Sequence, residues 1–241
     1  MMLMKKMLQF AMVGSLLSLS TVSCASEQIA ADTPAQESGA KSAGGRDART
    51  YLEQGNRFAA QGDYDRAIAA FNNVLAINPK DAEAYNNRGV VYENKRDHDR
   101  AVADFSLAIS LKDDYMEAYN NRGVAYKNKG DYDRAIDDFN KALKFNPGHI
   151  TAYYNRGVAY QNKGSYTLAI ADFDKVLNAN PKDAVTYWNK AQACEKVGRS
   201  REAVTAYQRF VEYAPAELKA YVEQAQQKIK VLQKKHQAKQ D

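Results

Sequence analysis

The chain has 241 residues, of which 45% are hydrophobic and 26% are charged, and its mean hydropathy is −0.62. With no long apolar run beyond the N-terminus, this composition excludes a protein built from several membrane-spanning helices. The net charge of +5 comes from the two ends, and the near-neutral stretch between them has no basic stripe with exposed aromatic residues, which argues against nucleic-acid binding.

Residues 1–23 have the pattern of a bacterial secretion signal. Lys5 and Lys6 precede an apolar run over residues 7–19, and small residues follow up to Cys24. The run is too short and wrongly flanked for a stable membrane span. Residues 21–24, Thr-Val-Ser-Cys, resemble a lipobox, in which the cysteine becomes the lipidated first residue, although Thr21 stands where Leu is usual.

We therefore expect lipidation of Cys24. Ala25 is not the Asp that typically retains such lipoproteins at the inner membrane, so the expected location is the outer membrane, facing the periplasm. The alternative is cleavage after Ala25 at an A-x-A-like site, which would give a soluble periplasmic protein. Residues 24–47 are rich in Ala, Ser, Gln and Gly and are expected to form a flexible linker.

From residue 48 to residue 217 the chain repeats with a period of 34 residues. The clearest copies are YNNRGVVY at 85–92, YNNRGVAY at 119–126 and YYNRGVAY at 153–160. The register gives five units: 48–81, 82–115, 116–149, 150–183 and 184–217. Positions below are counted within these units. A single unit cannot bury its apolar face alone, so the period predicts a stack of repeats.

Each unit contains two helical patterns separated by a turn. In the third unit, residues 116–127 and 132–144 flank Asn-Lys-Gly-Asp, a signal for a turn with Gly at a helix C-terminus. The small Gly123 and Ala135 allow the two helices to approach closely, Phe139 fills the space beside them, and Pro147 ends the second helix.

The pattern of small and aromatic residues resembles the tetratricopeptide repeat (TPR). Position 4 is always Tyr, position 8 is Gly in four units and Ala191 in the fifth, position 20 is always Ala, position 24 is aromatic, and position 32 is Pro except at Asp113. The resemblance implies an all-α fold: a right-handed superhelical solenoid of five helix-turn-helix repeats whose first helices line a concave groove. Residues 218–236 continue a helical pattern and are expected to cap the last repeat, before a basic tail at 237–241.

The expected groove is an asparagine ladder with valines between its rungs. Positions 2, 6, 9 and 13 share one helical face, and an Asn side chain both donates and accepts hydrogen bonds, as an extended peptide backbone requires. The resemblance implies peptide binding on such ladders. The candidate peptide-binding residues are Asn56, Asn87, Val90, Asn94, Asn121, Val124, Asn128, Tyr154, Asn155, Val158, Asn162, Trp188 and Asn189. The alternative is that these asparagines are solvated or bond the neighbouring repeat.

Two features of the expected groove bear on which peptides it could bind. The family's carboxylate clamp is only partly present, because Asn56 and Asn87 match it while Leu52, Glu117 and Asn121 stand at its cationic positions. Trp188 is the only tryptophan, and it is either an aromatic anchor for a partner or a residue packed under the terminal helix.

Position 7 predicts an internal ion pair. It is Arg in the second, third and fourth units, and those units also have Asp at position 23, whereas the first and fifth units have Ala there. The substitutions go together, so we expect an Arg–Asp pair between the two helices of each central repeat: Arg88–Asp104, Arg122–Asp138 and Arg156–Asp172.

No catalytic, metal or cofactor site is expected. Cys194 occupies a core position and is expected to be a packed thiol, and none of the three histidines lies within helical reach of it in sequence. The histidines form no metal-ligand spacing. We therefore expect a non-catalytic protein-binding scaffold, tethered by lipid at the bacterial envelope, that holds extended segments of partner proteins. The alternative is a self-assembling protein whose groove binds another copy.

Overall fold

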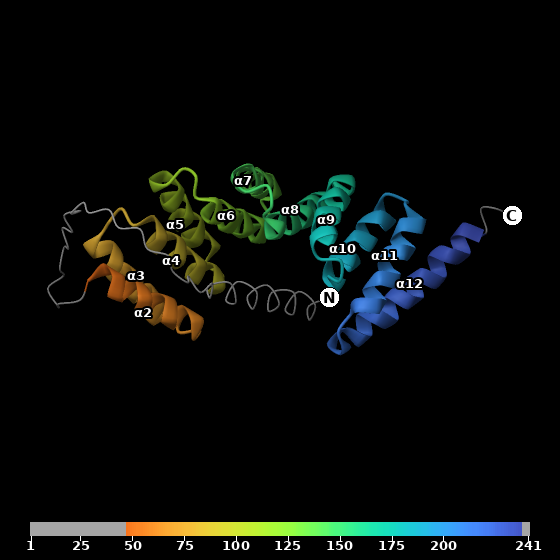
Figure 1. The fold of residues 1–241 in the computed structure, drawn as a ribbon, viewed down its shortest axis with the longest axis horizontal. Coiled ribbons are helices and arrows are strands. Elements are labelled where there is room, and N and C mark those ends of the chain that lie inside the picture. The colour runs from red at the N-terminus through yellow and green to blue at the C-terminus, as the bar shows by residue number, and fades with distance from the viewer. Residues whose placement is uncertain (1–46, 238–241) are drawn as a thin grey trace, which may run out of the picture. The chain divides into compact units, whose positions relative to one another are not determined.

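The structure is a computed structural model in which residues 47–237 are described. The expected signal peptide, the Cys24 lipidation site, nearly all of the linker and the tail beyond residue 237 lie outside this part of the chain. The chain divides into two compact units, one ending at Pro79 and the other beginning at Lys80. The first unit contains one helix pair among the described residues, and the second contains four pairs and a terminal helix (Figure 1).

All regular elements of the described residues are helices. They are α2 (Ala48–Ala60), α3 (Tyr64–Ile77), α4 (Ala82–Asn94), α5 (His98–Leu111), α6 (Met116–Lys129), α7 (Tyr132–Phe145), α8 (Ile150–Lys163), α9 (Tyr166–Ala179), α10 (Ala184–Lys196), α11 (Ser200–Tyr213), the short 3-10 helix η1 (Ala216–Leu218) and α12 (Lys219–Gln237). The expected all-α fold of helix pairs is confirmed, and each helix from α2 to α11 lies within one 34-residue unit.

The pair α6–α7 shows how the sequence sets the helix ends. Gly130 ends α6 with φ of 83°, a left-handed conformation that costs glycine little. The side chain of Asp131 then accepts a hydrogen bond from the backbone N–H of Arg134 and caps α7. After α7, Asn146 is extended and Pro147 follows, as expected for a residue that cannot continue a helix.

A close approach between the two helices explains the Gly at position 8. A Cβ atom built on Gly123 would lie 2.8 Å from Cε1 of Phe139, closer than real contacts allow. Phe139 is fully buried in a cluster with Ala135, Ile136 and Ala159, the last of which belongs to the next repeat. The ring of Phe139 therefore packs between the two helices of its own unit and also against the first helix of the following unit.

In the second unit, consecutive pairs stack because each second helix packs on the next first helix: α5 on α6, α7 on α8 and α9 on α10. An ion pair crosses two of these junctions at the same register. Lys129 pairs with Asp99, and Lys163 pairs with Asp133. These exposed pairs contribute little individually, but they repeat the same geometry from one junction to the next.

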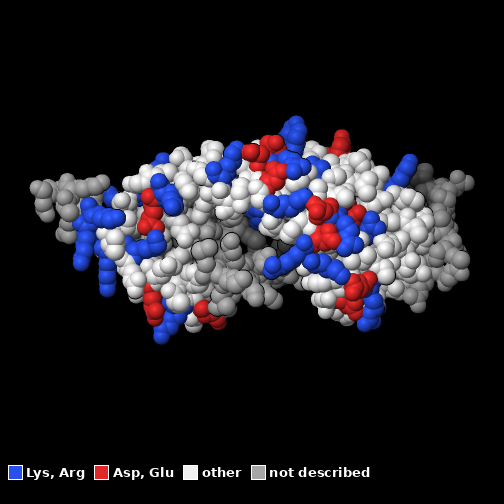
Figure 2. Space-filling model, turned by 180° about the vertical axis from the view of Figure 1, so that it is seen from behind, with Lys and Arg blue, Asp and Glu red and all other residues white. Residues whose placement is uncertain are grey.

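The terminal helix α12 packs against α11, as expected for a capping helix. Its Lys228 donates to Glu195 Oε2 on α10 at 2.6 Å, and the Tyr207 hydroxyl donates to the same oxygen at 2.6 Å. Between residues 47 and 237, no helix combines the length and the hydropathy needed to cross a membrane. On the face drawn in Figure 2, acidic and basic side chains lie intermixed rather than in separate patches.

Candidate functional site

The candidate surface is the inner face, which we define as the surface formed by the first helices α4, α6, α8 and α10 of the second unit. Neighbouring first helices contact each other directly. Side-chain hydrogen bonds cross the gaps between them: Asn121 to Asn86 at 3.0 Å, Gln161 to Gln192 at 3.3 Å, and Asn189 to the Tyr154 hydroxyl at 3.0 Å. A row of polar side chains therefore crosses the stack from repeat to repeat.

The predicted peptide-binding residues fall into three levels of exposure. The asparagines at position 13, Asn94, Asn128 and Asn162, are exposed. The valines at position 9 and most asparagines at position 6 are half-buried: Val90, Val124, Val158, Asn87, Asn121 and Asn189. Tyr154 and Asn155 are buried, at 8% and 2% exposed. Asn56 is exposed on α2, which belongs to the first unit.

Several asparagines of the ladder bond neighbouring repeats. Asn121 Nδ2 donates to Asn86 Oδ1, and Asn128 Nδ2 donates to Glu93 Oε1 at 2.5 Å. Asn155 Oδ1 accepts from Lys127 Nζ at 2.9 Å. A buried Asn must find such partners, since an unmet polar group inside a protein is costly. Asn121, Asn128 and Asn155 thus bond the neighbouring repeat, which was the alternative for the ladder, and Asn155 is also buried.

The aromatic residues at position 5 are also enclosed. Trp188 is 4% exposed, and its ring lies 5.5 Å from Tyr207, 5.0 Å from Phe210 and 5.4 Å from Tyr221 of α12, measured between centroids. Tyr154 packs on Phe173, and burial raises the pKa of its hydroxyl. Of the two alternatives for Trp188, the structure thus shows packing under the terminal helix, and Tyr154 is likewise enclosed.

The three predicted Arg–Asp pairs are confirmed. Arg122 donates from Nε and Nη2 to the two carboxylate oxygens of Asp138, each at 2.8 Å. Its remaining Nη1 donates to Ser106 Oγ on the preceding repeat at 3.0 Å. Burial raises the pKa of the Asp138 carboxyl, while the hydrogen bonds from Arg122 act in the opposite direction. Arg88 and Arg156 bind Asp104 and Asp172 in the same two-pronged way.

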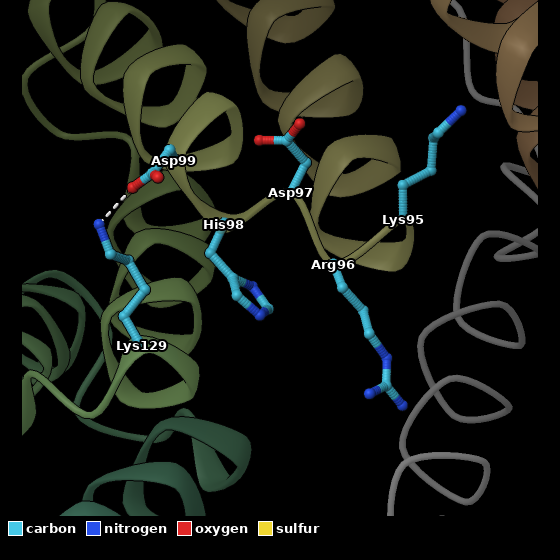
Figure 3. A pocket seen from close by; sticks show the side chains of 6 residues that line it. All are labelled: Lys95, Arg96, Asp97, His98, Asp99 and Lys129. Atoms are coloured by element: carbon cyan, nitrogen blue, oxygen red, sulfur yellow. Dashed lines mark hydrogen bonds and ion pairs between the residues drawn. The ribbon is translucent and has the colours of Figure 1, made fainter.

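A shallow pocket lies at the turn between α4 and α5 (Figure 3). Its lining residues are Lys95, Arg96, Asp97, His98, Asp99 and Lys129. Figure 3 shows Arg96 and Asp97 pointing to opposite sides, and Asp99 is already paired with Lys129. Asp97 also caps α5. Because the charged groups do not converge on one point, this pocket has no geometry for holding a ligand.

The described residues hold one cysteine, Cys194. Cys194 is fully buried, and burial raises its pKa to about 11, so it is a packed thiol as predicted. In the part of the chain that the structure describes, no three side chains of His, Cys, Asp and Glu come together as a metal site.

One inner-face residue, Lys127, was missed by the sequence reasoning. It occupies position 12, where the other units of the stack have Glu93, Gln161 and Glu195. Position 12 lies outside the asparagine pattern of positions 6 and 13. Its residues nevertheless carry a signal in the sequence, since this position is acidic in two units of the stack, neutral in one and basic only at Lys127.

Models of known protein families match the repeated part of the chain. A model described as TPR repeat matches residues 55–95, and models described as tetratricopeptide repeat match residues 82–115, 117–149, 150–183 and 184–217. Among curated protein sequences, none matches this chain.

Solved structures match over most of the chain. A crystal structure of MamA protein is 27% identical, with a TM-score of 0.64 over 73% of this chain and 95% of that one. A second MamA structure is 28% identical, with a TM-score of 0.63 over 69% and 96%. YrrB, described as "a TPR protein with an unusual peptide-binding site", is 20% identical, with a TM-score of 0.62 over 71% and 89%. The family models, these structures and the stacked helix pairs agree: the chain is a tetratricopeptide repeat protein.

Proposed function

We propose that this protein is a non-catalytic scaffold that holds extended peptide segments of partner proteins on its inner face. The observation that carries the proposal is a strip of half-buried valines, Val90, Val124 and Val158, bordered by the exposed asparagines at position 13. Valine offers apolar contact, and an exposed amide both donates to and accepts from a peptide backbone. The similarity to YrrB, which is described as having a peptide-binding site, supports the same use of the fold.

Photo-crosslinking tests which face binds. A benzophenone amino acid placed at Val124 or Val158 reports on the inner face. The matched control positions are Lys141 on α7 and Lys175 on α9, which are exposed on the second helices. We expect partner segments to crosslink in living cells from positions 124 and 158 and not from 141 and 175, with the crosslinked peptides identified by mass spectrometry.

Crosslinks from the control positions alone would move the function to the second helices and overturn the proposal. Crosslinks from position 124 to another copy of the chain would instead establish the self-assembly alternative. A further variant, with Asn94, Asn128 and Asn162 changed to Ala, removes three exposed amides and one exposed hydrogen bond, from Asn128 to Glu93. We expect it to keep its melting temperature to within a few degrees while losing crosslinking yield.

We also propose that Cys24 carries a lipid anchor that holds the scaffold at the outer membrane, facing the periplasm. The support is the basic, apolar and small-residue order of residues 1–24. Metabolic labelling with an alkyne fatty acid should label the native protein and not the Cys24→Ser variant. Labelling that persists in the variant would contradict the anchor, and an unlabelled native protein in the periplasmic fraction would establish the soluble alternative.

A further inference from the structure

Lys127 differs from the other cations that lie between the helices of the second unit. Arg88, Arg122, Arg156, Lys190 and Lys228 each form an ion pair with a carboxylate. Lys127 donates instead to the neutral amide oxygen of Asn155, and within residues 47–237 it forms no ion pair. A partly enclosed ammonium group without a counter-ion is unfavourable. This site therefore lacks the carboxylate that every comparable cation in the stack has.

The carboxylate whose charge acts on Lys127 already has other hydrogen-bond partners. Glu93, one repeat earlier on α4, has its Oε2 2.8 Å from Nδ1 of His98 and accepts from Asn128 Nδ2 through its Oε1. Burial lowers the pKa of Lys127 to about 8, and the charge of Glu93 acts in the opposite direction. The amine is therefore still mostly protonated at neutral pH, and it faces one carboxylate whose two oxygens are already engaged.

An unmet acceptor marks the same junction. Between α4 and α6, Asn86 Oδ1 accepts from Asn121. The equivalent atom between α6 and α8, Asn120 Oδ1, is buried and has no hydrogen-bond partner among the described residues. Asn155, the residue placed to donate to it, has its amide oxygen held by Lys127. The oxygen Oε1 of Gln161, also on α8, is buried without a partner in the same part of the chain. Near Lys127, two buried side-chain oxygens of the inner face thus lack, in the described part of the chain, the hydrogen bonds that they could accept.

We propose that Lys127 recognises a carboxylate of the polypeptide bound on the inner face. This inference rests on the proposed function and names the chemistry that the third and fourth repeats select. An incoming carboxylate takes the ammonium group from Asn155, whose amide then turns to bond Asn120 as Asn121 bonds Asn86. The site is separate from the family's carboxylate clamp, because the clamp's cationic positions hold Leu52, Glu117 and Asn121 in this chain.

The carboxylate has two possible sources: an Asp or Glu side chain, or the end of a chain. Two libraries of random 12-residue peptides separate these sources and serve as the probes. One library has both ends blocked, and the other has a free C-terminus. Each is selected on the purified full-length protein and, in parallel, on Lys127→Gln and on Lys144→Gln. Lys144 is an exposed lysine on α7 and provides the matched control.

We expect peptides selected on the native protein and on Lys144→Gln to share an acidic residue at one register, or a free C-terminus, and peptides selected on Lys127→Gln to lack that preference. Enrichment in the blocked library assigns a side chain, and enrichment in the free library alone assigns a terminal carboxylate. An acidic preference that survives Lys127→Gln, or retained peptides with no such preference, overturns this inference and leaves the scaffold intact. Retention of no peptide by any of the three proteins overturns both.

A double-mutant cycle then tests the contact itself. Replacing the enriched acidic residue of one peptide by its amide, and replacing Lys127 by Gln, should each weaken binding about tenfold, and the two together no further. Lys127→Arg keeps the charge and should recover most of the affinity. Additive losses would show that the two groups do not meet. Melting curves of each variant check that the fold is retained, which we expect because removing an unpaired charge does not destabilise the protein.

Discussion

Arg122 and Arg156 each join three helices through one side chain. Two guanidinium nitrogens bind Asp138 on α7, a third binds Ser106 on α5, and the group lies over the rings of Tyr119 and Tyr126. Only a planar group with several donors makes all of these contacts at once, which explains Arg rather than Lys at position 7. The side chain fastens the two helices of its own repeat and also the repeat before it.

The first prediction concerns this pair. Asp138→Ala leaves the guanidinium of Arg122 partly enclosed without its carboxylate, so we expect a loss of about 3 kcal/mol or more in the free energy of unfolding. Urea titration followed by circular dichroism measures the change.

The chain supplies the control for that prediction. The first repeat has Gln54 and Ala70 at the same two positions. The double variant Arg122→Gln/Asp138→Ala copies that combination and should recover most of the lost stability, because no charge remains unpaired. If the single and double variants lose equal amounts of unfolding free energy, the unpaired charge of Arg122 is not the cause of the loss.

The Arg–Asp pairs were predictable from sequence, whereas the state of the asparagines was not. Arg and Asp change together between repeats, so comparison within one chain reveals their contact. Asn121 and Asn155 occupy the same position in the same motif, yet only Asn155 is buried, and only Asn155 accepts a hydrogen bond from a lysine of the preceding repeat, Lys127. The environment of a repeated residue depends on its neighbours in adjacent repeats, and a motif read within one repeat does not contain them.

At the scale of single elements, the turn after α4 departs from its equivalents. Arg96 has φ of 61°, where the other repeats place Gly62, Gly130, Gly164 and Gly198 with φ between 75° and 89°. A left-handed conformation costs a residue with a Cβ about 1 kcal/mol or more. We expect Arg96→Gly to raise the free energy of unfolding by about that amount, measured by urea titration. Gly130→Arg should lower it similarly, and a destabilised Arg96→Gly would show that the arginine side chain contributes more than its backbone costs.

A second element makes stability depend on pH. The backbone N–H of Ala152 donates to Nδ1 of His149, which caps α8, and burial lowers the pKa of His149 below its ordinary value of 6.5. As pH falls through that value the unfolded chain takes up a proton first, and a protonated Nδ1 cannot accept the bond. The stability that the cap contributes is therefore present above pH 6.5 and is lost below it.

His149→Asn keeps a good cap without this titration. We expect the melting temperature of the native protein to fall more than that of the variant between about pH 7.5 and about pH 5.5, on either side of the ordinary pKa of histidine. Calorimetry at the two pH values measures the difference. Parallel falls in both proteins would assign the pH dependence to other groups.

For the molecule as a whole, α12 closes the stack. Its Tyr221 packs edge-on against Trp188, which is 4% exposed and in turn contacts Phe210. Ending the chain after Pro215 uncovers this apolar surface, so we expect a lower melting temperature, a red-shifted tryptophan emission and association at high concentration. Light scattering and fluorescence of the single tryptophan check this. Removing only residues 238–241 is the control, and an unchanged emission after the larger truncation would show that Trp188 is enclosed without α12.

The repeat architecture followed from sequence because one period governs small, aromatic and turn residues together. The role of Trp188 did not follow, since an aromatic residue at position 5 looks the same whether a partner or a terminal helix covers it. The rings of Tyr207, Phe210 and Tyr221 decide the matter, and they come from the second helix of the repeat and from α12. A contact that occurs only once, in the last repeat and the terminal helix, produces no repeated pattern in the sequence, so comparison between repeats cannot reveal it.

Two contacts between neighbouring repeats recur with equivalent donors and acceptors from one junction to the next. If residues 116–149 were removed, Arg156 would meet Ser106 instead of Asn140, and Lys163 would meet Asp99 instead of Asp133. Each new neighbour accepts the same donor. These two junction contacts would therefore survive the loss of a whole repeat, whereas the bond from Lys127 to Asn155 would not, because Glu93 would take the place of Lys127. The number of repeats can thus change with little cost at the shared junction contacts, and the cost falls on the contacts that only one junction makes.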